Sequence, residues 1–126
     1  MKNGHRILVV DDERDIAQVA SLRLRAAGYE TMTANDGDTG IVTALKQAPD
    51  AIVMDIRMPR KNGLAALAEL QARRETQHIP VIMLSASLVD QPAALDAGAR
   101  FFLTKPYEAQ TLLTAVQRAV DEASRR

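Results

Sequence analysis

Residues 51–55 read Ala-Ile-Val-Met-Asp, so four apolar residues lead directly into an acid. Three more apolar runs end in polar residues in the same way: residues 7–10 before Asp11 and Asp12, residues 81–84 before Ser85, and residues 101–104 before Lys105. Runs that are apolar throughout, rather than alternating, are typical of strands covered on both faces, as in a parallel sheet. The sequence therefore predicts a parallel sheet with polar groups at its strand ends.

The polar residues at these strand ends predict a ligand site. In an open parallel sheet, the residues just past the carboxyl ends of the strands meet at one rim, where ligands bind. That rim would gather the acids Asp11, Asp12 and Asp55, the hydroxyl of Ser85 and the ammonium of Lys105. Carboxylates suit a divalent cation, and a hydroxyl and a lysine suit a phosphoryl group.

Segments with a helical spacing of apolar residues separate the runs and follow the last of them. They predict helices over residues 14–27, 37–48, 64–73 and 108–124, and a weaker helix between Asp90 and Gly98. Asp12 can cap the first helix, and Asp90 can cap the weak one. Residues 29–34 alternate loosely and predict a further strand, nearer an edge. Five strand–helix units imply an α/β fold, a three-layer sandwich that residues 1–126 form as a single domain.

Composition narrows the class of protein. Sixteen basic and sixteen acidic side chains cancel, so no global field favours direct binding to nucleic acid or to an anionic membrane. Cysteine is absent, which excludes disulfides and thiolate metal sites. No apolar stretch approaches the roughly 20 residues that span a bilayer. A cytoplasmic protein is the expectation.

Each candidate site residue also has an ordinary structural explanation. Capping a helix could be the sole role of Asp11 and Asp12, and for these two residues taken alone that explanation is about as probable as a ligand site. Asp55 could be a turn acid, Ser85 a serine bonded to the local backbone, and Lys105 a solvated charge. Their joint occurrence at four strand ends favours a site, because four coincidences are far rarer than one.

Five short motifs, in their order and spacing, resemble the receiver domain of the two-component response-regulator family. The similarity covers essentially all 126 residues and lies in residues 7–13, residues 49–59 with Asn62-Gly63, Ser85-Ala86, residues 97–99, and Thr104-Lys105-Pro106. Each motif alone is a weak pattern, whereas the set is highly specific. The resemblance implies a (βα)5 flavodoxin-like sandwich with a parallel five-stranded sheet in the order 2-1-3-4-5. It also implies a cis peptide bond before Pro106.

The resemblance further implies a role for each site residue. Asp55 would accept a phosphoryl group from a histidine on a partner, either a histidine kinase or a histidine phosphotransfer protein. Mg²⁺ would be the cofactor, held directly by Asp12 and Asp55, through water by Asp11, and by the backbone carbonyl of Arg57. Lys105 and Ser85 would bind phosphoryl oxygens. Such a chain is a phosphoacceptor that participates in its own phosphorylation and dephosphorylation rather than an enzyme.

The output implied by the resemblance is a change of shape. Ser85 would move toward the phosphate and Phe102 would turn inward, so that an unidentified output protein or domain reads the surface of helix 4, strand 5 and helix 5. Many relatives have an acid and a tyrosine where this chain has Phe101 and Phe102. The family's charged dimer contacts on this surface align with Ala93, Phe101 and Ala115, none of which is charged. That dimer is therefore not expected.

Arg57 and Ser87 lie two residues past Asp55 and Ser85, at family positions that tune dephosphorylation. Whether Arg57 shields the acyl phosphate or is simply solvated stays open from the sequence. Two other classes of protein share part of this residue set but fit the sequence less well than a phosphorylatable receiver. A phosphatase of the haloacid dehalogenase type would need an acid at position 57, and a degenerate receiver, acting only as an interaction module, would usually have lost acids from the pocket. The sequence does not identify the kinase, the output partner, the phosphate lifetime, the oligomeric state, or whether the chain acts alone or as part of a longer protein.

Overall fold

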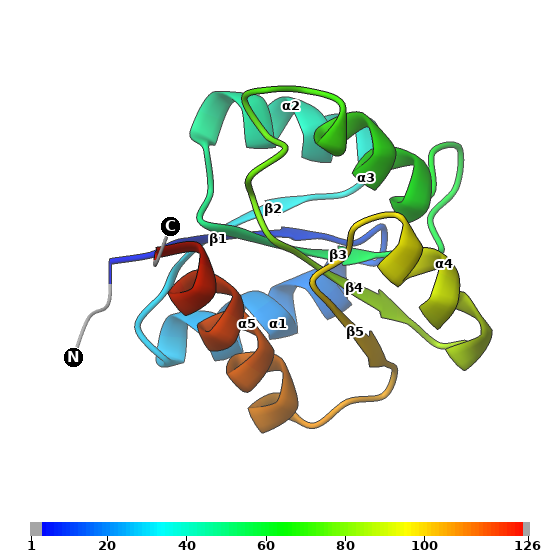
Figure 1. Cartoon of the computed structure of the whole chain (residues 1–126). Coiled ribbons are helices and arrows are strands. Elements are labelled where there is room, and N and C mark those ends of the chain that lie inside the picture. The colour runs from blue at the N-terminus through cyan, green and yellow to red at the C-terminus, as the bar shows by residue number, and fades with distance from the viewer. Residues whose placement is uncertain (1–3, 125–126) are drawn as a thin grey trace.

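A parallel sheet forms the centre of the molecule (Figure 1). The computed structural model describes residues 4–124, and the strands there are β1 (Arg6–Val10), β2 (Glu30–Ala34), β3 (Ala51–Asp55), β4 (Val81–Ser85) and β5 (Phe101–Thr104). They lie in the order β2-β1-β3-β4-β5, and every neighbouring pair is parallel. The predicted strand order is confirmed.

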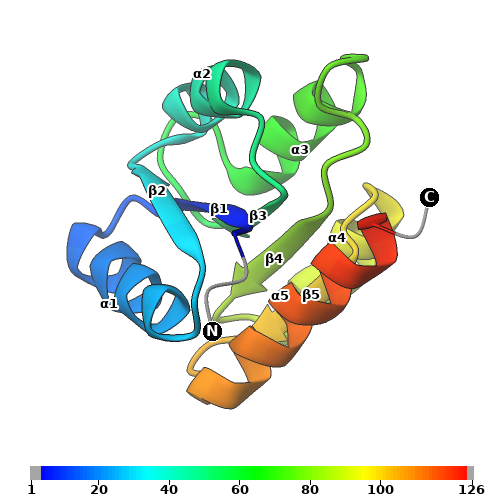
Figure 2. The same cartoon turned by 90° about the vertical axis from the view of Figure 1, so that its left-hand side faces the viewer.

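Helices cover both faces of the sheet, which gives the three layers of the predicted sandwich (Figures 1 and 2). One face is covered by α1 (Arg14–Ala26) and α5 (Ala109–Ser124), the other by α2 (Gly37–Gln47), α3 (Gly63–Gln71) and α4 (Gln91–Asp96). Successive side chains of a strand point to opposite faces. Within β1, Leu8 packs with α2 and α3, whereas Ile7 and Val9 pack with α1 and α5. Two buried clusters therefore hold the central strands from both sides.

The two edge strands are less buried than the three central ones. All five residues of β3 and of β4 are buried, whereas β2 buries only Ala34 and no residue of β5 is fully buried. The edge position predicted for residues 29–34 is confirmed. The apolar run of β5 also predicted a strand covered on both faces, and β5 does pack against both clusters, with Phe102 on one face and Phe101 and Leu103 on the other. The cover is incomplete, because β5 ends the sheet and leaves Thr104 exposed.

Of the two predicted helix caps, Asp12 is wrong, and Asp90 is confirmed in position but not in its hydrogen bond. The residue that precedes α1 is Glu13, and Asp12 does not occupy the capping position. Asp90 does precede α4, at the end of the short 3-10 turn η1 (Leu88–Asp90), but its side chain makes no capping hydrogen bond. Both carboxylates are therefore available for other contacts at the rim. The Lys105–Pro106 peptide bond is cis, as the resemblance implied.

Candidate functional site

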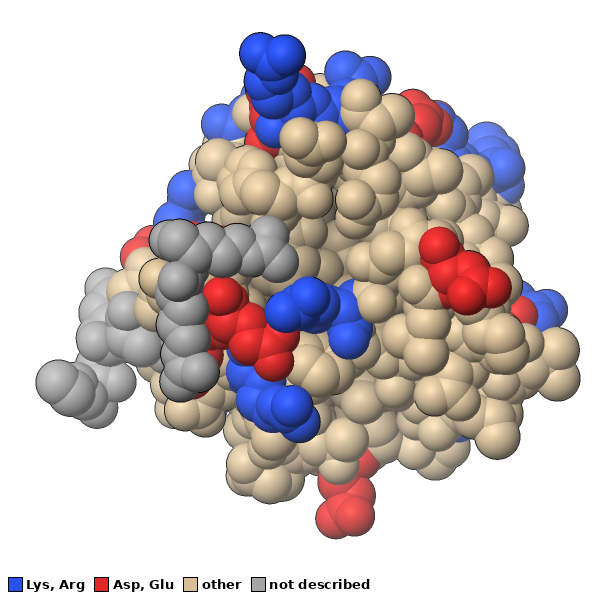
Figure 3. All heavy atoms as spheres, in the orientation of Figure 1, with Lys and Arg blue, Asp and Glu red and all other residues tan. Residues whose placement is uncertain are grey.

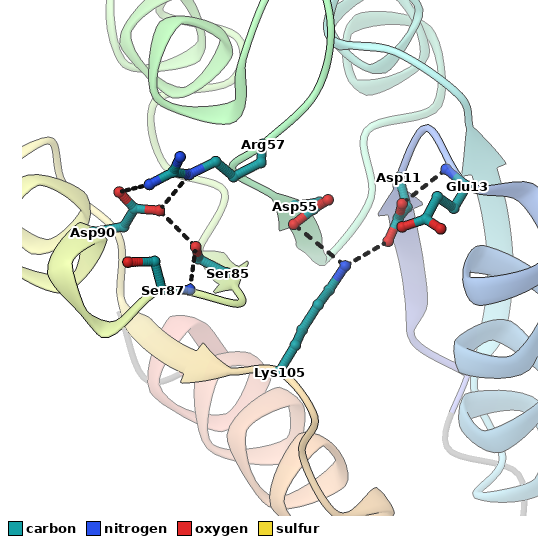
Figure 4. A network of polar contacts seen from close by, with 8 residues as sticks. All are labelled: Asp11, Glu13, Asp55, Arg57, Ser85, Ser87, Asp90 and Lys105. Carbon is teal, nitrogen blue, oxygen red and sulfur yellow. Dashed lines mark hydrogen bonds and ion pairs between the residues drawn. The ribbon is translucent and has the colours of Figure 1, made fainter.

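Four strand ends bring the predicted site residues to one rim of the sheet (Figure 4). Asp55 is the last residue of β3 and Ser85 the last residue of β4, while Asp11 and Lys105 directly follow β1 and β5. Asp11, Asp55 and Ser85 are 2%, 5% and 0% exposed. Polar groups buried to this degree are costly unless partners satisfy them, so their contacts define what the site can do.

Lys105 joins two of the acids from below, as the close-up shows (Figure 4). Its Nζ lies 3.3 Å from Asp55 Oδ1 and donates a hydrogen bond to Asp11 Oδ2 at 3.2 Å. The other oxygen of Asp11, Oδ1, accepts the backbone N–H of Glu13 at 2.9 Å. Both carboxylate oxygens of Asp11 are thus engaged by the protein itself.

The donor set fits a hard divalent cation. Carboxylate oxygens of Asp11, Asp12 and Asp55 lie within 4.8 Å of one another, and Asp12 is only partly buried. Three carboxylates this close repel one another unless positive charge is added, and Mg²⁺ prefers oxygen ligands while keeping several waters. Lys105 supplies one positive charge at this cluster, so three carboxylates and one ammonium leave a net negative charge that a divalent cation would balance.

Electrostatics at Asp55 reflect this crowding. Burial raises the pKa of Asp55 to about 6, Lys105 opposes the rise, and the neighbouring charges of Asp11 and Asp12 add to it. For Lys105, burial works against the charged form, but Asp55 and Asp11 outweigh it and raise the pKa of the ammonium. The lysine is therefore charged at neutral pH, and Asp55 is ionised there with little margin.

Gly63, at the start of α3, lets the loop after Asp55 close tightly. A Cβ at this position would lie 2.4 Å from the backbone oxygen of Asp55 and 2.9 Å from Ile56 Cα. The Gly63 N–H donates to the Ile56 carbonyl at 2.7 Å, and the Asn62 side chain caps α3 by accepting the N–H of Ala65. The sequence motif Asn62-Gly63 therefore has a physical reason: only glycine fits against the backbone of the site.

The hydroxyl of Ser85 does not point to Asp55 but is held by a network on the far side (Figure 4). Ser85 Oγ donates to Asp90 Oδ2 at 2.5 Å and accepts the backbone N–H of Ser87 at 3.1 Å. Arg57 in turn donates to both oxygens of Asp90, from Nε at 3.0 Å and from Nη2 at 3.1 Å. The hydrogen bonds from Arg57 and then Ser85 lower the pKa of Asp90, which keeps it ionised.

Asp90 is the site residue that the sequence did not reveal. An acid just before a helix is normally interpreted as a cap, and no spacing rule connects it with Arg57, which lies 33 residues earlier. From the sequence, Arg57 either shields the acyl phosphate or is simply solvated. In the structure its side chain is 64% exposed, yet it is paired with Asp90 rather than free in solvent. Phe102 is half-buried and packs against the cluster under α2, α3 and α4.

A family model for the response regulator receiver domain matches residues 7–117. The chain belongs to this family. The match includes all four strand ends and both loops that carry Arg57 and Asp90. The receiver fold and the two-component class expected from the sequence motifs are thereby confirmed.

Curated relatives and solved receiver structures agree with this assignment. The chain is 40% identical over 114 residues to the transcriptional regulatory protein PrrA of Mycobacterium tuberculosis, and 35% identical over 114 residues to the DNA-binding dual master transcriptional regulator RpaA of Synechocystis. These alignments cover 89% of this chain but only 48% and 47% of the relatives. The chain therefore spans about half the length of these relatives.

Among solved structures, a response regulator receiver domain protein from Clostridium thermocellum superposes with a TM-score of 0.88 at 31% identity, covering 95% of this chain and 97% of that one. The receiver domain of a sensor histidine kinase from Pseudomonas aeruginosa, whose active-site cleft coordinates a magnesium ion, gives a TM-score of 0.86 at 32% identity, covering 94% and 98%. Within residues 4–124 of the present chain, no helix has the length and apolar character needed to cross a bilayer.

Proposed function

We propose that this receiver accepts a phosphoryl group on Asp55 in a Mg²⁺-dependent phosphorelay and passes the signal on through a change of shape. Residues 1–126 would act as one receiver domain. The observation that carries the proposal is the meeting of a buried Asp55 with Lys105 Nζ at 3.3 Å and with two further carboxylates at the same rim. A nucleophile, a fixed positive charge and a cation site are the parts that phosphoryl transfer to a carboxylate needs.

The chemistry assigns each residue a task. A carboxylate oxygen of Asp55 attacks phosphorus; a P–O bond forms while the P–N bond to the donor histidine breaks, and the electron pair leaves with the imidazole. Lys105 is already held between Asp55 and Asp11, so it offers a preorganised charge for a phosphoryl oxygen. Asp12, Asp55, the carbonyl of Arg57 and, through water, Asp11 would hold Mg²⁺, which when bound offsets negative charge on the phosphoryl oxygens. The domain thus participates in its own phosphorylation and dephosphorylation without being an enzyme acting on a separate substrate.

A groove beside the site supports a protein as the donor. It has a volume of about 580 Å³ and lies between α1 and residues 105–107. Its lining is largely apolar, with Ile16, Val19 and Pro106, and Val19 is 48% exposed. We propose that the histidine kinase or histidine phosphotransfer protein docks here, because the groove adjoins Lys105 and so leads to Asp55.

The output would be read from α4, β5 and α5, with Ser85 and Phe102 as the switching residues. The two curated relatives named above are regulators of transcription that are about twice as long. A DNA-binding output would then belong to a further domain or to a partner, and the balanced charge of this chain fits a receiver that itself binds neither nucleic acid nor membrane. A cytoplasmic location follows from this role as part of the proposal.

The two alternative functions fit the site less well. A receiver that serves only as an interaction module has no need of Asp11, Asp12, Asp55 and Lys105 in one connected set. A phosphatase of the haloacid dehalogenase type needs an acid two residues after the nucleophile, where Arg57 here forms an ion pair directed away from Asp55.

Labelling with a small phosphodonor tests the proposal. With Mg²⁺ and acetyl phosphate, the wild-type protein should gain one acid-labile phosphoryl group, seen as a single mass increment in intact-protein spectra. Asp55→Asn should remove it altogether, because an amide is not a competent nucleophile. Asp38→Ala, which removes an exposed acid outside the cluster, is the matched control and should label normally. Equal labelling of Asp55→Asn and wild type would refute the assignment.

A further inference from the structure

The Ser85 hydroxyl has a single proton to donate, and in this structure that proton is committed. Ser85 is 0% exposed, and its Oγ donates to Asp90 Oδ2 at 2.5 Å. The same Oγ accepts the N–H of Ser87, which fixes its lone pairs toward the 86–90 turn. The Ser85 hydroxyl could donate a hydrogen bond to a phosphoryl oxygen on Asp55 only if its hydrogen bond to Asp90 were broken.

Asp90 is itself held in place from the opposite loop. Arg57 follows β3 by two residues and binds both oxygens of Asp90, at 3.0 and 3.1 Å, in the fork geometry that makes arginine–carboxylate pairs strong and directional. The Asp90 side chain makes no capping bond to α4 and is only 14% exposed. Its contacts are thus those of a clamp between the 56–62 loop and the turn after β4.

We propose that Asp90 and Arg57 form a latch that holds the Ser85 hydroxyl away from Asp55 in the resting protein and sets the threshold for switching. The proposal rests on the phosphoacceptor role of Asp55. A phosphoryl group on Asp55 competes with Asp90 for the hydrogen bond of the Ser85 hydroxyl and repels the Asp90 carboxylate. Part of the interaction energy of the phosphate is therefore spent on opening the latch. Asp90 is a positioning residue, because it acts through Ser85.

An ordinary exposed ion pair would not hold the Ser85 hydroxyl in place. The 56–62 loop makes one such pair through Arg60, which serves for comparison. Arg60 and Asp36 make a single contact at 3.7 Å, with the arginine side chain 76% exposed. Pairs of that kind contribute little. The Arg57–Asp90 pair differs in being bidentate and in continuing to a fully buried hydroxyl. Arg60→Ala is thus a charge-matched control for Arg57→Ala.

Binding of the phosphate mimic beryllofluoride, in the presence of Mg²⁺, tests the latch. Asp90→Ala should bind beryllofluoride about three- to tenfold more tightly than wild type, because Ser85 no longer has a competing acceptor. In a Ser85→Ala background, the same substitution should change the affinity less than twofold, since only the general effect of removing a charge remains. Asp38→Ala, which removes an acid paired with Lys61 of the same loop, should leave the affinity unchanged.

Two further variants keep the test independent of folding. The asparagine in Asp90→Asn has the same shape as aspartate and can still accept the hydrogen bond from the Ser85 hydroxyl. The affinity of this variant for beryllofluoride should therefore lie between those of wild type and Asp90→Ala. Arg57→Ala keeps the carbonyl of residue 57 and should bind beryllofluoride more tightly than Arg60→Ala, because it frees Asp90. Unchanged amide exchange of β1 and β3 would verify the fold of each variant.

The outcomes separate the latch from the function beneath it. The latch is refuted, while the phosphoacceptor role stands, if wild type and Asp90→Ala bind beryllofluoride with equal affinity. The same conclusion follows if Asp90→Ala raises the affinity as much in the Ser85→Ala background as in wild type. If wild type neither binds beryllofluoride nor is labelled by acetyl phosphate, both are refuted. A gain that depends on Ser85 supports the latch.

Discussion

The rim of the sheet divides into two regions that are built differently. The ends of β1 and β3 carry Asp11 and Asp55 on strands whose residues 7–10 and 51–55 are all buried between helices. Residues 86–103, which follow β4, are loosely packed: α4 has six residues and buries only Ala94, and Leu88, Val89 and Leu95 are 63%, 82% and 45% exposed. In Figure 3 the right-hand part of the surface, over α4, is mostly neutral.

The tightly packed region suits the chemistry of phosphoryl transfer, and the loosely packed region suits the change of shape that follows it. Phosphoryl transfer needs groups that keep their distances, and tight burial on both faces of a central strand provides that. A switch needs a segment with a second arrangement of similar free energy, and such segments come from the least stable parts of a fold. Ser85 lies at the boundary, since it ends the fully buried β4 and begins the loose segment.

Substitution of one large apolar residue in each region gives the largest expected contrast. Leu8 is 0% exposed, so Leu8→Ala should lower the free energy of unfolding by about 2–5 kcal/mol through lost burial and a residual cavity. Val89→Ala, at 82% exposure, should change it by less than about 0.5 kcal/mol. Urea unfolding measures both. Similar losses in the two variants would remove the distinction between the regions.

The pH dependence of stability tests the crowding at Asp55. Because the pKa of Asp55 is raised to about 6 in the folded protein, against about 3.9 when unfolded, the folded state binds this proton more tightly. The resulting stabilisation is complete below the unfolded pKa and is lost as pH rises through about 6. Without Mg²⁺, wild type should lose about 2 kcal/mol relative to Asp55→Asn between pH 4 and pH 7.

Parallel stability profiles of the two proteins would show that Asp55 is not crowded as the structure indicates. Adding Mg²⁺ at pH 7 should restore part of the lost stability in wild type only, because the cation binds the folded acid cluster. Asp38→Asn is the control here, since Asp38 lies outside that cluster and its side chain is 72% exposed.

Within the rigid region, Asp11 and Asp12 should differ in their effect on Mg²⁺ affinity. Both oxygens of Asp11 are engaged, by Lys105 and by the Glu13 N–H, whereas Asp12 does not serve as a helix cap. Asp12→Ala should therefore weaken Mg²⁺ binding about tenfold more than Asp11→Ala, a difference of about 1.4 kcal/mol by calorimetric titration. A greater loss in Asp11→Ala would exchange the proposed direct and water-mediated roles.

The sequence predicted the rigid region better than the loose one. Continuous apolar runs correctly predicted the strands β1, β3 and β4. An acid or a hydroxyl directly after each run correctly predicted which residues meet at the rim of the sheet. Periodicity could not show that β5 would end the sheet, because its residues are as apolar as those of a central strand. The Asp90–Arg57 contact also escaped prediction, since it joins two loops 33 residues apart and depends on how the fold brings them together.

Amide hydrogen exchange of wild type and Ser85→Ala, each with Mg²⁺ and with or without beryllofluoride, tests most directly whether chemistry and response are separate. The account predicts that beryllofluoride changes exchange within residues 86–103 of wild type and leaves β1 and β3 nearly unchanged. Ser85→Ala should still bind the mimic and accept label on Asp55, yet show a reduced response in residues 86–103, because the tether is missing. A full wild-type response in Ser85→Ala would contradict the account.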